Sequence, residues 1–154
     1  MMNTETFVVP FEDTDSGEIM NPFKKQVMDF LCILEGFKVK FKNLHWSAAN
    51  KAIHVQIDET LAIINKYEDE IAEEYQGIFT NFQPDFLKAF EVKYNSPNLA
   101  LKALMTNIET FYRGIPEELI YVGIKGNCES FMSDLNIQQY LYNLIYNSNL
   151  KTDM

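Results

Sequence analysis

Cysteine is scarce in this chain: Cys32 and Cys128 are the only two in 154 residues, and they form no CxxC pair. This excludes a disulfide framework and a thiolate zinc site, and it favours a reducing, cytoplasmic setting. No apolar run approaches the ~20 residues that a membrane helix needs. The N-terminus also lacks the basic-then-apolar order of a signal peptide. The sequence therefore predicts a soluble protein with no membrane segment.

Basic residues are also few: the chain has 13 basic and 22 acidic side chains, which give a formal net charge of -9. Such a chain repels nucleic acid and anionic membranes and attracts cations, so DNA binding is not expected. The 47% hydrophobic content is enough for one substantial core but not for two. One folded domain is expected.

Residues 1–20 differ from the rest of the chain. They contain five acidic residues, no Lys or Arg, and Pro10 and Gly17 as breaks. This composition predicts an acidic, extended N-terminal arm preceding a folded domain at 21–150. The apolar residues between Phe7 and Phe11 could dock on a protein partner.

Apolar residues recur at helical spacing over four long stretches, and no strand alternation is apparent. The first helix is expected at about 23–46, after Asn21-Pro22, and the second from after Asn50 to Gly77. A third begins at Ser96-Pro97 and is interrupted by Gly114 and Pro116. The fourth is expected at about 127–147. The fold class is all-α.

The connection between the second and third helices is too long for a simple turn, and Pro84-Asp85 can open a short helix ending near Val92. A long connection of this kind permits the crossover topology of ferritin-like bundles. The sequence therefore predicts a ferritin-like four-helix bundle whose crossover carries a short helix.

The two histidines of the chain, His45 and His54, are only nine positions apart, at the end of the first helix and the start of the second. Within the second helix, His54 and Asp58 are separated by four residues, as are Asp69 and Glu73, and the two pairs are eleven residues apart. Eleven residues are close to three helical turns, so these four side chains share one face. Imidazole and carboxylate ligands together suit Fe(II) and other borderline divalent metals.

One chain cannot close a metal site from this face, because Asp58 and Asp69 are about 16 Å apart along the helix axis. Two copies of the helix crossing antiparallel about a two-fold axis would place His54 and Asp58 of one chain against Asp69 and Glu73 of the other. The spacing thus predicts two metal sites per dimer.

Other acidic residues on the second helix have a simpler interpretation. Glu68, Glu70 and Glu74 are expected to form part of a solvated helix face, as carboxylates at helical spacing usually do. Trp46 has two interpretations: it either fills the interface between the first two helices or lies as a redox-active neighbour of the metal.

Lys42-Asn43-Leu44-His45-Trp46, His54-x3-Asp58 and Asp69-Glu70-Ile71-Ala72-Glu73 together resemble the Dps-type mini-ferritins, a branch of the ferritin-like superfamily. The resemblance covers residues 25–77, and the expected short helix near 84–92 also matches a small helix of that family. It implies an iron site with His45, His54 and Asp58 from one chain and Asp69 and Glu73 from its neighbour.

The resemblance further implies oxidation of Fe(II) by peroxide or oxygen, storage of ferric iron in a dodecameric cage built from dimers, and protection from oxidative stress. Two features depart from the family. The loop between His45 and His54 is shorter than usual, so His45 either remains a ligand or leaves His54 as the only imidazole. The acidic arm also replaces the lysine-rich tail that some relatives use to bind DNA.

A Glu-x-x-His motif is missing, which disfavours the intrasubunit di-iron centre of larger ferritins. The competing hypothesis is a non-catalytic structural or assembly protein, for example of a virus particle or another large complex, that reuses the same bundle.

Overall fold

The computed structural model describes residues 21–79 and 85–153, with side chains as far as residue 147. They form four long helices and one short 3-10 turn, in the order α1 (Pro22–Trp46), α2 (Lys51–Ile78), α3 (Pro97–Arg113), η2 (Leu119–Tyr121) and α4 (Val122–Asp153). No strand occurs in the described ranges. The predicted all-α chain with four helices is confirmed, whereas the predicted arm at 1–20 lies outside the described residues.

The first three helices begin where polar side chains cap them. The Asn21 side chain accepts a hydrogen bond from the Phe23 amide, and Asn50 accepts one from Ile53. Ser96 does the same for the amide of Leu99. Each cap satisfies an amide that has no partner within the helix, which explains why the predicted starts agree with the structure.

The fourth helix begins at Val122, five residues earlier than predicted. This first turn contains Gly123 and Gly126, and glycine disfavours helical backbone. In the structure Gly123 packs directly against the Glu74 carboxylate of α2, and a Cβ atom at this position would overlap that carboxylate. Packing between α2 and α4 thus overrides the local preference.

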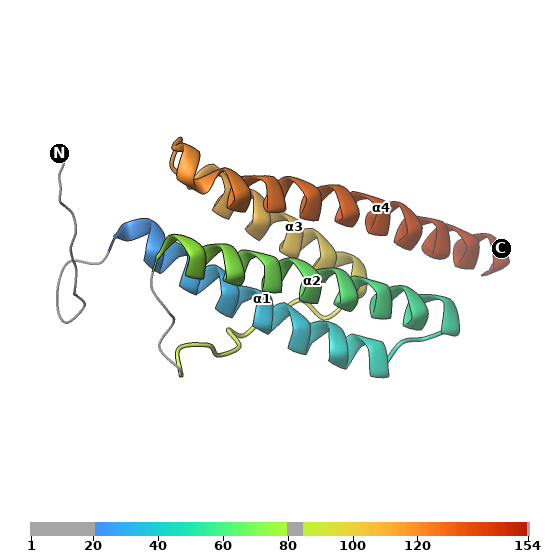
Figure 1. Ribbon diagram of the computed structural model, residues 1–154. Coiled ribbons are helices and arrows are strands. Elements are labelled where there is room, and N and C mark those ends of the chain that lie inside the picture. Colours follow the sequence, from blue (N-terminus) through green and yellow to red (C-terminus); the bar gives the residue numbers. More distant parts are fainter. Residues whose placement is uncertain (1–20, 80–84, 154) are drawn as a thin grey trace, which may run out of the picture.

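Figure 1 shows α1 antiparallel to α2 and α3 antiparallel to α4, while α2 and α3 run in the same direction. In the connection from α2 to α3, residues 85–96 contact the middle of α1. Phe90 donates a backbone hydrogen bond to the carbonyl of Cys32, and Lys40 bonds to Asn95 further along. Gly36 permits this close approach, because a Cβ atom there would overlap the Phe90 carbonyl.

The short helix expected at about 84–92 is not present at 85–92. This stretch has a turn at Asp85 and otherwise no regular secondary structure. The reason is that its polar groups pair with α1, as when the Phe86 carbonyl accepts from the Cys32 thiol, rather than with one another. The prediction was therefore wrong over these residues.

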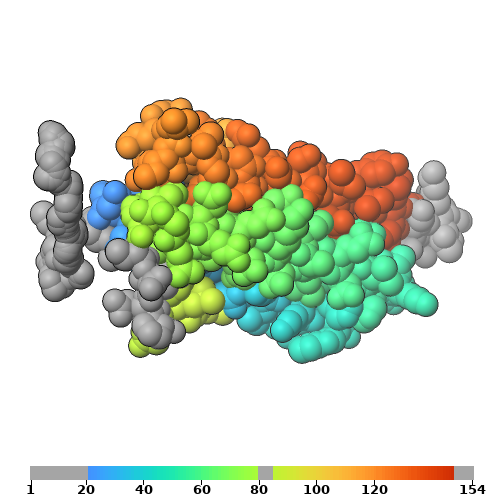
Figure 2. Space-filling view, viewed as in Figure 1, coloured from blue at the N-terminus to red at the C-terminus, as the bar shows by residue number. Residues whose placement is uncertain are grey.

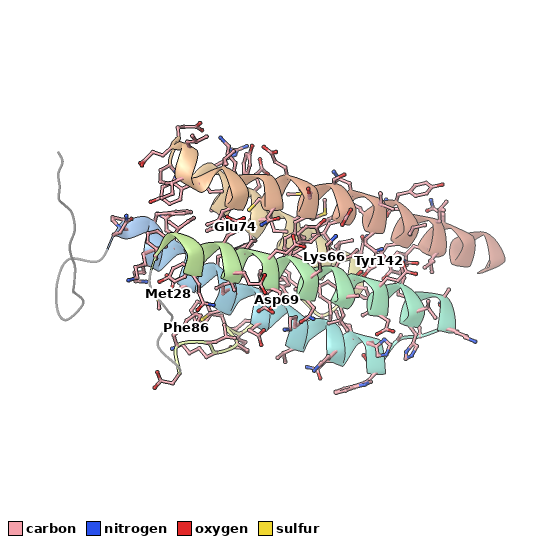
Figure 3. All side chains as sticks on the ribbon, in the orientation of Figure 1. Met28, Lys66, Asp69, Glu74, Phe86 and Tyr142 are labelled. Carbon is pink, nitrogen blue, oxygen red and sulfur yellow. The ribbon has the colours of Figure 1, made fainter. Side chains whose placement is uncertain are left out.

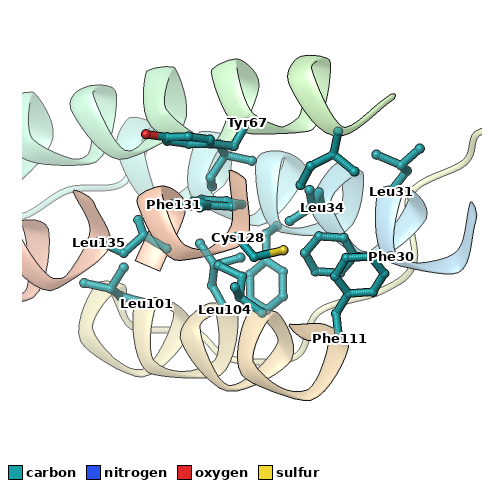
Figure 4. Packing of buried hydrophobic residues seen from close by; sticks show 14 of the residues in the cluster. Phe30, Leu31, Leu34, Tyr67, Leu101, Leu104, Phe111, Cys128, Phe131 and Leu135 are labelled. Carbon is teal, nitrogen blue, oxygen red and sulfur yellow. The ribbon is translucent and has the colours of Figure 1, made fainter. Parts of the chain in front are cut away.

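The core lies between all four helices and is rich in aromatic rings (Figure 4). Phe30 of α1 stacks on Phe111 of α3 with ring centroids 4.1 Å apart, and Tyr67 of α2 stacks on Phe131 of α4 at 4.9 Å. These contacts fix the side of each helix that faces solvent. Among the described helices, none combines the length and the apolar character that crossing a bilayer would require.

Candidate metal centre

His45 and His54 lie in direct contact at the end of the bundle where α1 turns into α2. Their rings stack with centroids 3.7 Å apart and planes inclined by 23°. Each Nδ1 atom forms a hydrogen bond to the backbone carbonyl of the other residue, at 2.9 Å for His45 and 2.8 Å for His54. The short connection between the helices therefore brings the two predicted residues together.

These reciprocal bonds determine which ring nitrogen is available to a metal. A carbonyl oxygen only accepts, so each Nδ1 must carry the hydrogen. In the neutral form of both rings, the lone pair is then on Nε2. Metal-binding histidines usually donate their other ring N–H to a carbonyl or carboxylate in this way. His45 and His54 are thus both in the tautomer that suits metal binding.

The predicted stripe on α2 lies on its solvent-facing side. His54, Asp58, Asp69 and Glu73 are all exposed, whereas Ile57 on the neighbouring side of the helix is fully buried. Asp69 projects from the outer side of α2 in Figure 3, away from α4. The expectation that these four side chains share a face separate from the core is met.

The single chain brings His45 and His54 together and places Asp58 one turn away. It does not bring Asp69 or Glu73 to them, because these residues lie about three and about four turns beyond Asp58 along α2. Among residues 21–79 and 85–147, no three His, Cys, Asp or Glu side chains converge closely enough to hold a metal ion. The predicted five residues thus form two separate half-sets in one chain.

Glu73 of the second half-set borders an open groove between α2 and α4, with a volume of about 530 Å³. Its lining consists of Glu70, Glu73, Glu74, Gly77, Ile78 and Asn127. Glu74 points toward α4 (Figure 3), so the groove has an acidic wall on the α2 side. No basic side chain stands in the last turn of α2, and carboxylates near the negative end of a helix are unfavourable without a cation.

Glu68 is not on a solvated face, contrary to the sequence prediction. It is only 9% exposed and lies against α1, where Lys38 binds its Oε1 at 2.7 Å and also binds Glu35 at 2.8 Å. The Asn65 side chain accepts a further hydrogen bond from Lys38. Glu68 follows the helical spacing of the buried residues Ile64 and Ile71, and this position was the signal that it would face inward.

Burial raises the pKa of the Glu68 carboxyl to about 7, and the neighbouring Glu35 carboxyl adds to the shift while Lys38 opposes it. The pKa of Glu35 is lowered, first by hydrogen bonding with Glu68. The Oε2 atom of Glu68 accepts no hydrogen bond. A proton on Glu68 would let it donate to Glu35, which explains why these two acidic groups can lie together.

A buried polar network between α2 and α4 was not predicted. Thr60, fully buried, bonds to the Gln138 side chain at 2.8 Å and to the Tyr142 hydroxyl at 2.7 Å. Gln56 also bonds to Gln138, at 3.0 Å. A sequence shows which polar residues occupy core positions. Which of them bond to one another depends on how α2 packs against α4, and the bonded residues are about 80 positions apart in the sequence. The network fixes how α4 is aligned on α2.

Trp46 does not fill the interface between α1 and α2, because its side chain is 73% exposed. Its packing interpretation is therefore wrong within one chain. It stands beside His45 at the outer end of the bundle, where it is available to a neighbouring molecule.

Comparison of the chain with protein-family models, with curated proteins and with solved structures finds no match.

Proposed function

We propose that this chain is a divergent Dps-type mini-ferritin with a ferritin-like bundle, which binds Fe(II) at a site shared between two subunits, oxidises it and stores ferric iron. The observation that carries the proposal is the paired arrangement of His45 and His54, with both Nε2 atoms available, above an exposed row of carboxylates. The parallel course of α2 and α3, joined by a connection along α1, supports the ferritin-like crossover.

The proposed site forms when two copies of α2 pack antiparallel about a two-fold axis. His54 and Glu73 are equidistant from the midpoint between Ile63 and Ile64, and so are Asp58 and Asp69. An axis at this midpoint brings each imidazole end against the carboxylate end of the other copy. Repulsion between the two acidic faces would oppose such a dimer, and bound cations would relieve it.

Within the site, His54 and Asp58 of one chain and Asp69 and Glu73 of the other would hold the iron. His45 would add a second imidazole and, through its hydrogen bonds, orient His54. Iron is the substrate here: two Fe(II) ions lose one electron each, and one peroxide takes both electrons and two protons to give two water molecules. The acidic surface would favour Fe(II) entry and mineral nucleation.

We also propose an oligomeric state and a cellular location. Dimers of this type can build a closed cage, for which a dodecamer is the expectation, and the acidic chain would not bind DNA. The free thiols of the buried Cys32 and Cys128 support a reducing, cytoplasmic setting.

The test is Fe(II) oxidation with added peroxide or oxygen by the wild type and by an Asp58→Ala, Glu73→Ala variant. The matched control is Glu70→Ala, Glu74→Ala, which also removes two carboxylates from the same helix. We expect the first variant to fall to the background rate and the control to keep most of the wild-type rate. Equal background rates in all three proteins would contradict the proposal.

That contradictory outcome would favour the second candidate, a structural or assembly protein of a large complex or virus particle. The observation behind it is the amount of exposed apolar surface on α4, where Ile137 and Tyr140 point into solvent.

A further inference from the structure

The side of α4 that points away from the bundle is nearly uncharged. Its core side is set by buried residues such as Phe131 and Leu135, and a line of residues at helical spacing lies opposite them. We call this line the α4 ridge; it consists of Gly126, Ser130, Ser133, Ile137, Tyr140 and Leu144.

Three apolar members of the α4 ridge are largely exposed. Ile137 is 57% exposed, Tyr140 61% and Leu144 45%. They follow one another at spacings of three and four residues, so they form one continuous strip and not scattered single side chains. A continuous apolar strip of this kind marks a surface that another molecule covers.

No contact among the described residues explains why position 126 is a glycine. A Cβ atom added to it would meet none of the described residues within 4 Å, whereas one added to Gly123 would overlap the Glu74 carboxylate unless that side chain moved. A glycine inside a helix is less favourable than an alanine. The recess that Gly126 leaves on the ridge therefore suits something outside the chain.

Small and large residues of the α4 ridge are arranged symmetrically about Leu135. Ser133 and Ile137 lie two positions either side of it, Ser130 and Tyr140 five, and Gly126 and Leu144 nine. In each pair the N-terminal member is small and the C-terminal member is large. If a second α4 packs antiparallel with its two-fold axis at Leu135, every large side chain lies opposite a small one.

Charge also favours a second copy as the occupant. The chain has a net charge of -9, so two copies repel wherever their acidic faces meet. The ridge itself contains no charged residue, and Glu129 beside it already accepts a hydrogen bond from the Tyr112 hydroxyl. This is a face along which two copies can approach without bringing like charges together.

We propose that the α4 ridge is a self-association surface, on which α4 of a second copy packs antiparallel with Gly126, Ser130 and Ser133 receiving Leu144, Tyr140 and Ile137. This contact is separate from the proposed iron-binding contact of α2 and needs no metal. Two distinct two-fold contacts on one chain would allow an assembly larger than a dimer.

The first test measures particle mass in solution by analytical ultracentrifugation, with a chelator present so that iron plays no part. We expect Ile137→Arg to reduce the mass by at least half, because it places a charge in the contact. The matched control is Leu99→Arg on α3, which changes an equally exposed apolar residue and should leave the mass unchanged. A monomeric wild type, or equal masses for wild type and Ile137→Arg, would overturn the proposal and assign the ridge to another occupant.

The second test measures the register by disulfide formation between mixed single-cysteine variants under an added thiol oxidant. Ser133→Cys mixed with Ile137→Cys should cross-link several-fold more than either variant alone, because antiparallel packing puts these positions opposite each other. Ser133→Cys mixed with Leu144→Cys is the mismatched control, displaced by about 10 Å along the helix. The native Cys32 and Cys128 are buried and contribute little. Preferential cross-linking of Ser133→Cys with itself would indicate a different packing and overturn the proposed register.

Discussion

Helices α2 and α4 lie next to each other (Figure 2), yet the chemistry of their outer sides is opposite. The outer side of α2 carries His54, Asp58, Asp69 and Glu73, whereas the α4 ridge carries no charge. Both sides are exposed, and both contain residues placed symmetrically about a point on their own helix.

The difference shows how two neighbouring helices can support different kinds of contact. Two copies of the α2 side repel each other until a cation compensates the carboxylates, so association there is expected to depend on metal. Two copies of the α4 ridge bury apolar area and need no ion. Four predictions test the core that supports both surfaces, the packing on either side of α2 and the contact of the α4 ridge, from the largest expected effect to the smallest.

Phe30→Ala should disrupt both the outer side of α2 and the α4 ridge, because one hydrophobic core holds both helices in place. The Phe30 ring stacks on Phe111 and is almost fully buried. Removing a buried aromatic ring is expected to lower the free energy of unfolding by about 3–5 kcal/mol. Urea denaturation followed by circular dichroism measures this change. A loss well below 1 kcal/mol would mean that α1 and α3 are not packed as described.

Thr60→Val should disturb the alignment of α4 on α2 without removing packing volume. It deletes the hydroxyl that bonds to Gln138 and Tyr142, so the buried Tyr142 hydroxyl loses this bond while Gln138 still accepts one from Gln56. A loss of about 1–3 kcal/mol in the free energy of unfolding is expected. Thr110→Val, at an exposed position, serves as the control and should change stability very little. Similar losses in the two variants would argue against the network.

The pH dependence of stability should reveal the buried Glu68 on the α1 side of α2. Its pKa is about 7 in the folded chain against a reference of 4.5, so the folded state binds more protons than the unfolded state between these values. Stability from this group is therefore fully present below pH 4.5 and is lost as the pH rises through about 7.

Urea denaturation of metal-free protein at several pH values measures that slope. Glu68→Gln should flatten it, while Glu70→Gln, which removes a charge from the groove side of the same helix, should preserve it. An identical slope for wild type and Glu68→Gln would contradict the assignment.

Gly126→Ala should stabilise the folded chain and at the same time weaken self-association through the α4 ridge. Because an added methyl group meets nothing within the chain, the variant should gain about 0.5–1 kcal/mol in the free energy of unfolding. The same methyl group would fill the recess expected to receive Leu144, so self-association should weaken. Gly77→Ala on α2 is the control: it also has open space, and should leave association unchanged. Unchanged association in Gly126→Ala would count against the ridge contact.

The sequence was sufficient to predict what depends on neighbouring residues. Helix starts at Asn21, Asn50 and Ser96 follow from local capping, and the exposed stripe on α2 follows from helical periodicity. Features that depend on distant contacts were missed. The start of α4 at Val122 requires α2 to pack against Gly123, which no local pattern reveals.

At the candidate site, too, features that depend on contacts between distant residues were missed. The close pairing of His45 and His54 depends on how two helices and a four-residue connection meet, and the sequence left this open. The burial of Glu68 could have been predicted, since it follows the spacing of Ile64 and Ile71, but its charge favoured the solvent-facing interpretation. A charged residue can be buried when a cation such as Lys38 pairs with it.

The central claim is that each iron site needs two chains, and mixing two inactive variants tests it most directly. His54→Ala and Glu73→Ala each break both sites of their own dimer. When equal amounts are unfolded together and refolded, half the dimers should be mixed, and each mixed dimer has one intact site of two. The account predicts Fe(II) oxidation at about a quarter of the wild-type rate per chain. A mixture that oxidises Fe(II) no faster than the average of the two variants alone would contradict it.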